Sequence, residues 1–247
     1  MDNKKAADVI RQILNLEYEP IAVKFSSDDT PLGGFETPSD RRYCQVLMGA
    51  REGKKYLLTA GNISCPAAAW ALGFKEPPPK LTSGEMPYAM GIFGSPKAVQ
   101  KTLASMPRLE MGKYQMVACC PLGQAPFEPD VVVIESAVEH IMWVALANVF
   151  ETGGRLEFNT AILQATCVDG TIMPLLNQQI HASLGCYGCR EATNMAESEC
   201  VLGFPFKDLE RIVSSLNKLN ERAIPRVRGK AIYRALLGRK TSREEET

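Results

Sequence analysis

The fold is decided by the stretch Pro129-Asp130-Val131-Val132-Val133-Ile134. Its consecutive β-branched residues favour a strand that is buried on both faces. A second run of this kind, Pro20-Ile21-Ala22-Val23-Lys24-Phe25, lies early in the chain and also begins with proline. Segments with helical periodicity follow both runs. This alternation predicts an α/β domain, with α+β as the alternative, in which helices flank mixed sheets.

The remaining predicted elements follow from apolar spacing and from helix-capping residues. Ser95-Pro96 is typical of a helix start, because proline suits the first helical position. Predicted helices cover residues 5–16 and 138–149, and three more begin near residue 39 or 40, at residue 96 and near residue 209. Further predicted strands cover residues 54–59 and 155–166.

The two halves of the chain share one order of predicted elements: strand, helix, glycine, strand and cysteine. This order indicates two diverged copies, over residues 18–107 and 128–222, packed about a pseudo-twofold axis. Cys65 and Cys167 would then occupy equivalent positions near the axis. A chance similarity between two α/β units is the alternative. We expect a single domain over residues 1–247, with a basic C-terminal helix and tail over 223–247.

The composition is that of an ordinary soluble globular protein. The chain has 247 residues, of which 45% are hydrophobic, and its 28 basic and 28 acidic residues give zero net charge. Zero net charge provides no electrostatic attraction to nucleic acid or anionic lipid, so neither is an expected partner. The most apolar run, residues 141–150, is too short to span a bilayer, and the N-terminal residues lack a signal-peptide pattern. We therefore expect a cytoplasmic protein.

Eight cysteines against two histidines are the unusual feature of the composition. Cytoplasmic thiols stay reduced, so this excess favours metal binding or redox chemistry over disulfides. The sequence has one C-x-x-C, Cys186 to Cys189, whereas a zinc ribbon needs two. The residues before Cys186 do not predict a strand, which argues against a thioredoxin-like motif.

Four of the cysteines form the preferred ligand set. Four thiolates hold a [4Fe–4S] or [2Fe–2S] centre, and dispersed ligands suit a cluster that links distant segments. Cys119 and Cys120 are adjacent, so on a strand they would face opposite sides. Cys200 is most simply structural, and Cys189 is the reserve ligand. The set combines a helix face, two strand ends and a glycine loop: Cys44, Cys65, Cys167 and Cys186.

Several short motifs in order resemble those of the domain-of-unknown-function 169 family, also called ArCR, of archaea and anaerobic bacteria. They are Pro20-Ile21-Ala22-Val23-Lys24, Tyr43-Cys44-Gln45, Cys65-Pro66 with Leu72-Gly73-Phe74, Pro129-Asp130-Val131-Val132-Val133, and Ser183-Leu184-Gly185-Cys186-x-Gly188-x-Arg190. The resemblance covers about residues 10 to 220. It implies the same four cysteines, adds Gly188 and Arg190 as candidate cofactor-binding residues, and implies an anaerobic setting. It implies no particular reaction.

The expected function is that of an iron–sulfur protein, with a cluster of the [4Fe–4S] type. A cluster would serve electron transfer or act as a Lewis acid, as in an oxidoreductase or another cluster-dependent enzyme. Expected partners are a redox protein or a small anionic substrate, for which Lys24, Arg42 and Arg190 are candidate contacts. Two alternatives remain open: structural zinc or packed cysteines in a scaffold protein, and a carrier that binds an anionic cofactor through its basic C-terminal segment.

Overall fold

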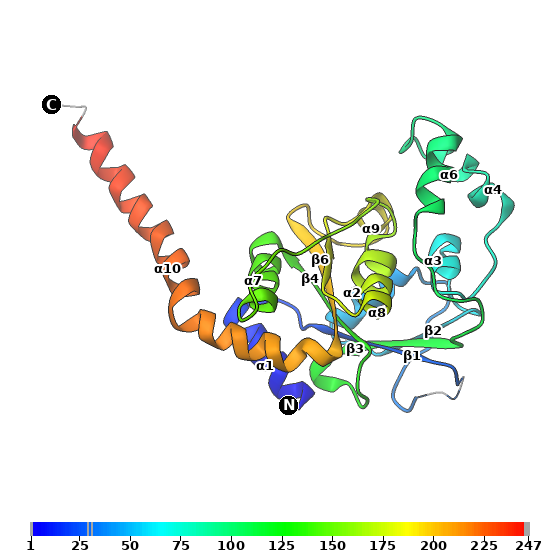
Figure 1. Ribbon diagram of the computed structural model, residues 1–247, viewed down its shortest axis with the longest axis horizontal. Coiled ribbons are helices and arrows are strands. Elements are labelled where there is room, and N and C mark those ends of the chain that lie inside the picture. The colour runs from blue at the N-terminus through cyan, green and yellow to red at the C-terminus, as the bar shows by residue number, and fades with distance from the viewer. Residues whose placement is uncertain (1, 29, 31, 245–247) are drawn as a thin grey trace.

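A single six-stranded sheet forms the centre of the computed structural model, which describes residues 2–28, 30 and 32–244 (Figure 1). The strands run antiparallel in the order β2-β3-β1-β4-β6-β5. Their bounds are β1 Ile21–Ser26, β2 Tyr56–Thr59, β3 Met116–Pro121, β4 Val131–Ala137, β5 His181–Ser183 and β6 Glu199–Pro205.

The two strands at the middle of this sheet are those that the β-branched runs predict. β1 pairs with β4, with Ile21 opposite Val133 and Val23 opposite Val131. All four residues are fully buried, because helices cover the sheet on both faces. The prediction of strands with flanking helices is confirmed. The sheet is single and antiparallel, rather than one of several mixed sheets, because β3 lies between β1 and β2 and separates two strands that run in the same direction.

Helices from distant parts of the chain cover the two faces. One face packs against α1 (Asn3–Leu14), α7 (Val138–Val149) and the start of α10 (Leu209–Glu244). The opposite face packs against α2 (Tyr43–Arg51), α3 (Pro66–Ala71), the π-helix η2 (Ala165–Ile172) and α9 (Tyr187–Ala192). This second face holds the candidate site described below.

The chain visits the sheet in the same order in both halves. β3 and β2 lie outward of β1 as β6 and β5 lie outward of β4. In the first half, α2, β2 and α3 follow one another on the covered face. In the second half, η2, β5 and α9 do so, with α8 (Met173–Asn177) between η2 and β5. The two halves thus share an order of elements, while the internal duplication and its pseudo-twofold axis stay predictions.

The predicted strand over 155–166 is wrong, and with it the equivalence of Cys65 and Cys167. Residues 153–161 form neither helix nor strand, and 165–172 form η2. Phe158 packs edge-on against the His181 ring instead of joining the sheet. In the order of elements, Cys167 in η2 corresponds to Cys44 in α2, and Cys186 before α9 corresponds to Cys65 before α3.

A helical insertion separates α3 from β3. It contains α4 (Pro79–Thr82), α5 (Glu85–Ala89) and α6 (Pro96–Ala104) and lies to one side of the sheet (Figure 1). The predicted start of α6 is confirmed, because Ser95 caps it by accepting a hydrogen bond from the Ala98 N–H at 3.2 Å. Leu81, Val99 and Leu103 form a small core of the insertion, separate from the main core.

Two helix boundaries differ from those predicted. α2 begins at Tyr43 rather than near Ser39 or Asp40, because Arg41 forms a β-bridge with Ile63 and keeps the preceding chain extended. The expected C-terminal helix is the second part of α10, which is continuous from Leu209 through Pro225 to Glu244. Residues 245–247 of the predicted tail lie outside the described residues.

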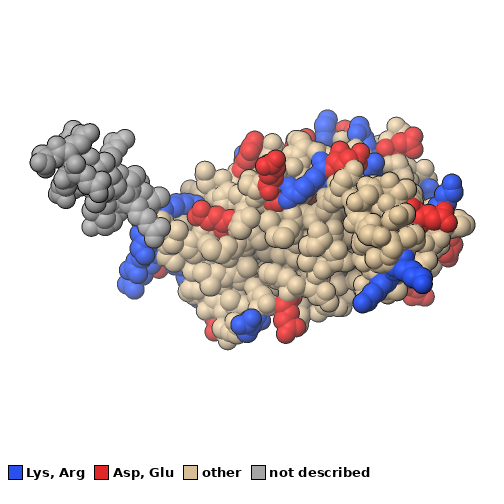
Figure 2. All heavy atoms as spheres, turned by 90° about the horizontal axis from the view of Figure 1, so that it is seen from above, with Lys and Arg blue, Asp and Glu red and all other residues tan. Residues whose placement is uncertain are grey.

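Charges of both signs are mixed on one face of the molecule (Figure 2). Figure 2 shows acidic and basic side chains interspersed on the face in view, as expected from equal numbers of the two charges. Among the residues that the structure describes, no helix combines the length and apolar character needed to cross a membrane.

Candidate metal centre

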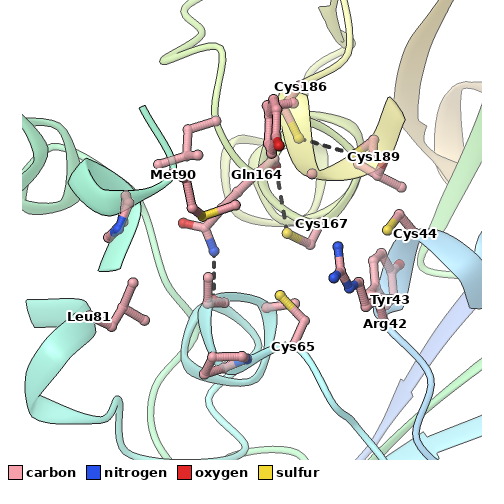
Figure 3. A pocket seen from close by; sticks show the side chains of 18 of the residues that line it. Arg42, Tyr43, Cys44, Cys65, Leu81, Met90, Gln164, Cys167, Cys186 and Cys189 are labelled. Carbon is pink, nitrogen blue, oxygen red and sulfur yellow. Dashed lines mark hydrogen bonds between the residues drawn. The ribbon is translucent and has the colours of Figure 1, made fainter. Parts of the chain in front are cut away.

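Five cysteines from four separate segments line one cavity of about 280 Å³ (Figure 3). The cavity lies beside the first turns of α2, α3 and α9, against η2 and the helical insertion. The structure therefore brings together all four cysteines of the predicted ligand set and the reserve. They are Cys44, Cys65, Cys167, Cys186 and Cys189.

Helix starts position three of the sulfurs. Cys44 is the second residue of α2, and Cys65 and Cys186 immediately precede the first residues of α3 and α9. The first N–H groups of a helix lack acceptors within it, so they are available to sulfur. Hydrogen bonds of this kind tune iron–sulfur centres. Cys167 reaches the same space from η2, which packs on β6.

The thiols of the second half lie close together. The sulfurs of Cys186 and Cys189 are 3.2 Å apart, and the Thr166 hydroxyl lies 3.0 Å from the Cys189 sulfur. Burial raises the pKa of Cys167 well above its usual value, and the neighbouring Cys65, Cys189 and Cys186 add to the rise. The hydrogen bond with Cys189, together with burial, raises the pKa of Cys186. Without a bound cation these thiols are therefore neutral, and metal binding would release their protons.

Arg42 supplies positive charge beside the sulfurs. It precedes α2 and forms a 2.6 Å salt bridge with Glu191 of α9, which links the two halves across the cavity. Glu191 raises the pKa of Arg42, and Cys65 and Cys44 act in the same direction. Figure 3 shows the guanidinium directed among the cysteines. This predicted contact residue is therefore at the site.

A buried carboxyl group behind the sulfur wall is not apparent from the sequence. Glu135 of β4 accepts a hydrogen bond from Thr166 at 3.4 Å, and Thr166 in turn contacts Cys189. The second Glu135 oxygen is buried without a hydrogen-bond partner. Burial raises the pKa of Glu135 to about 7, although Arg51 lowers it. The site thus contains a chain of polar groups that runs from a buried carboxyl, through Thr166, to the Cys189 sulfur.

Gly188 and Arg190 have different positions. Gly188 lines the cavity, and a side chain there would meet open space. Arg190 does not line the cavity; its guanidinium donates to the carbonyls of Leu184, Ala196 and Glu199. These bonds hold the chain around Cys186 against β6, so Arg190 supports the site from outside it.

The other predicted residues lie away from the cavity. Cys119 and Cys120 face opposite sides of β3, as predicted, with Cys119 beneath Tyr43. Cys200 is buried in β6 on the face that packs against α7 and α10. Lys24 forms a 2.8 Å salt bridge with Asp130.

The C-x-x-C segment differs from the sequence expectation. β5 precedes Cys186, so the motif does lie between a strand and a helix, contrary to what its sequence indicates. β5 is three residues long, which is too short for a periodic signal. Gly185 allows the turn between them because its φ is +91°. The hydrogen bond with Cys189 and burial, however, raise the pKa of Cys186. The hydrogen bond with Cys186 lowers the pKa of Cys189, but the hydrogen bond with Cys44 and burial outweigh it and raise this pKa to about 11, whereas catalytic dithiols require a lowered pKa.

Single-ion sites and clusters place different demands on their cysteine ligands. No group of three or more histidine, cysteine or acidic side chains in the described part of the chain is placed to bind a single ion. A tetrahedral zinc site requires four ligands at about 2.1–2.3 Å from one centre. In an iron–sulfur cluster the cysteines bind different irons, so their sulfurs lie further apart around a larger group.

Comparison with known proteins identifies the family of this chain. A family described as Uncharacterised ArCR, domain-of-unknown-function 169, matches residues 9–215. The chain is also 27% identical over 222 residues to the uncharacterized protein MJ0308 of Methanocaldococcus jannaschii, and the match covers 88% of this chain and 95% of that protein. No solved structure matches the chain. The match to most of its length shows that the chain belongs to the domain-of-unknown-function 169 (ArCR) family.

Proposed function

We propose that the protein binds an iron–sulfur cluster of the [4Fe–4S] type through Cys44, Cys65, Cys167 and Cys186. One observation carries the proposal: four segments far apart in the chain each place a cysteine at the wall of one cavity. Free cysteines are common in protein cores, but packing alone gives no reason for them to meet around open space. A site for a group held by several thiolates gives that reason.

The order of elements favours Cys186 over Cys189 as the fourth ligand. The α2–β2–α3 segment provides Cys44 and Cys65, and the corresponding η2–β5–α9 segment provides Cys167 and Cys186. The position three residues after Cys65 is Ala68, so Cys189 has no counterpart in the first half. Each half would thus contribute two ligands, with Cys189 as the extra thiol.

The surroundings fit an anionic cluster that takes part in electron transfer or in cluster-assisted catalysis. Arg42 would offset part of the negative charge of four thiolates, and Glu191 fixes its position. Thr166 and the backbone N–H groups at the helix starts would tune the reduction potential. A redox protein or a small substrate would be the partner, and a reducing cytoplasm would keep the thiols available.

Serine variants of single cysteines test the ligand set. The full chain, purified without oxygen, should be brown with absorption from iron–sulfur charge transfer. Cys44→Ser and Cys167→Ser should lose most of this absorption, because each removes one iron ligand. Cys120→Ser and Cys200→Ser are matched controls. Both cysteines are buried outside the cavity, so these variants should keep the iron–sulfur absorption.

The same series tests the choice between neighbouring thiols. Cys186→Ser should bleach the protein, whereas Cys189→Ser should keep its colour. The opposite result would assign the fourth ligand to Cys189. A colourless wild-type protein with one zinc ion per chain would instead support the structural zinc site and overturn the cluster.

Dithiol–disulfide exchange is a second candidate, favoured by the 3.2 Å distance between the Cys186 and Cys189 sulfurs. A disulfide between them needs only a small approach to about 2.05 Å. Mass spectrometry after alkylation would detect it as a loss of two reactive thiols on mild oxidation. This candidate predicts that Cys186→Ser and Cys189→Ser each abolish dithiol–disulfide exchange activity. It also predicts that this activity does not depend on the iron content of the protein.

A further inference from the structure

The cavity has two walls of different chemistry. Sulfurs and Arg42 line one side, and apolar side chains of the helical insertion line the other. In Figure 3, Leu81 and Met90 lie across the Gln164 side chain from Cys186 and Cys189. Residues of the insertion that form this apolar wall are Leu81, Met86, Pro87, Met90, Ile92 and Leu103.

The apolar wall is not part of the frame that holds the cysteines. In the second half, residues 193–198 alone connect α9 to β6, whereas the first half places α4, α5 and α6 between α3 and β3. The insertion packs around its own core of Leu81, Val99 and Leu103. Because the second half presents Cys167 and Cys186 without such an insertion, holding sulfur does not require this wall.

In the part of the chain that the structure describes, the residues that line the cavity provide no free charge to pair with a strongly charged ligand at the apolar wall. Arg42 is the one charged side chain among the described residues that line the cavity, and Glu191 already pairs with it. Gln164 directs its amide N–H to the Ala67 carbonyl at 2.6 Å. Binding pockets of this kind take ligands that are mostly apolar and leave few polar groups unpaired.

The available volume limits the size of the occupant. An apolar cavity of about 150 Å³ is large enough to bind benzene. Here the whole cavity is about 280 Å³, and its sulfur end is the proposed place of the cluster. Met86 and Met90 are unbranched and adaptable, so the wall can adjust to different shapes.

We propose that the apolar part of this cavity binds a small, uncharged, apolar molecule, up to about the size of one aromatic ring, beside the cysteines. Binding depends on the cavity alone. That the molecule meets a cluster there rests on the function proposed above. The insertion thus provides a substrate or ligand chamber that opens on the sulfur wall.

Fluorobenzene and 4-fluorobenzoate test the chamber, because they share a ring and differ in charge. We expect ¹⁹F NMR titrations of the full-length, anaerobically purified protein to show saturable binding of fluorobenzene, at least tenfold tighter than that of 4-fluorobenzoate. Met90→Trp should weaken the binding of fluorobenzene by at least tenfold, because Met90 lines the cavity. The variant should fold, because the side chain of Met90 is half-exposed and this position tolerates a larger residue. Met86→Trp is a second filling variant. Met142→Trp is the control, since Met142 is half-exposed on α7, which packs on the opposite face of the sheet.

Three results would overturn the chamber: no saturable binding of fluorobenzene, equal or tighter binding of 4-fluorobenzoate, or unchanged affinity in both filling variants. The failure of the cluster gives a different result. If the protein contains no iron but binds fluorobenzene, and the filling variants weaken this binding as expected, the chamber is supported and the cluster is rejected. A brown protein that does not bind fluorobenzene would keep the cluster and reject the chamber.

Discussion

Replacement of Glu135 by glutamine tests whether an uncharged carboxyl group lies behind the sulfur wall. Glu135 is 6% exposed, and burial raises its pKa from 4.5 to about 7 against the opposing effect of Arg51. The folded protein therefore prefers the protonated form. In the unfolded chain the group ionises at its usual pKa, so its contribution to stability is greatest below pH 4.5 and is lost as the pH rises toward 7.

The expected magnitude follows from this difference in pKa between the folded and unfolded chain. Above pH 7 the ionisable carboxyl lowers the free energy of unfolding by about 3 kcal/mol relative to a group that stays neutral. Glutamine does not ionise. Between pH 5 and pH 8, the free energy of unfolding of Glu135→Gln should therefore rise by about 2–3 kcal/mol relative to that of the wild type. Guanidinium denaturation followed by circular dichroism, on both proteins after the same chelator treatment, measures this difference.

Glu128→Gln is the matched control, because Glu128 is exposed. Its free energy of unfolding should stay within about 0.5 kcal/mol of the wild type at both pH values. Two results would exclude a raised pKa for Glu135: a stability difference between Glu135→Gln and the wild type that does not change with pH, or a wild type that becomes more stable relative to the variant as the pH rises. Either result would mean that Glu135 is ionised in the folded protein and paired with Arg51.

Three further substitutions test the packing around the site. Arg51→Met should lower the free energy of unfolding by about 3–5 kcal/mol, because it removes a buried partner of Glu199, 2.9 Å away; a loss below about 1 kcal/mol in chemical denaturation would contradict this. Gly185→Ala should cost about 1–3 kcal/mol because φ is +91° there, and an unchanged melting temperature would argue against that backbone conformation. Gly203→Ala should prevent folding, because its Cβ would collide with the carbonyl oxygen of Gly170, and a circular dichroism spectrum like that of the wild type would exclude this close approach of η2 to β6.

The central strands could be predicted from a strong local signal, and the four cysteines from their excess in the sequence together with the family resemblance. A β-branched run such as Val131-Val132-Val133 buries both faces of a strand wherever it lies. The resemblance to the family pointed to the four cysteines that line the cavity. Their positions on local elements were less reliable, since Cys167 lies in a π-helix and not at the end of a strand.

The features that the sequence did not indicate depend on tertiary contacts. Residues 155–166 contain apolar residues that suit a strand, but Phe158 packs on His181 and the segment stays outside the sheet. In the sequence Glu135 is an ordinary acidic residue. Its raised pKa arises because the fold buries it beside Arg51 and Thr166. Arg190 is similar: its role follows from three carbonyls that the fold brings to it. No local pattern encodes these neighbours.

The most direct test of the proposed cluster is the iron, acid-labile sulfide and zinc content of the anaerobically purified wild-type chain. A [4Fe–4S] cluster predicts about four iron and four sulfide per chain and no stoichiometric zinc. Cys44→Ser should lose most of the iron and sulfide, while Cys200→Ser should retain both. A folded wild-type protein with neither iron nor sulfide, or with one zinc ion in their place, would contradict the account.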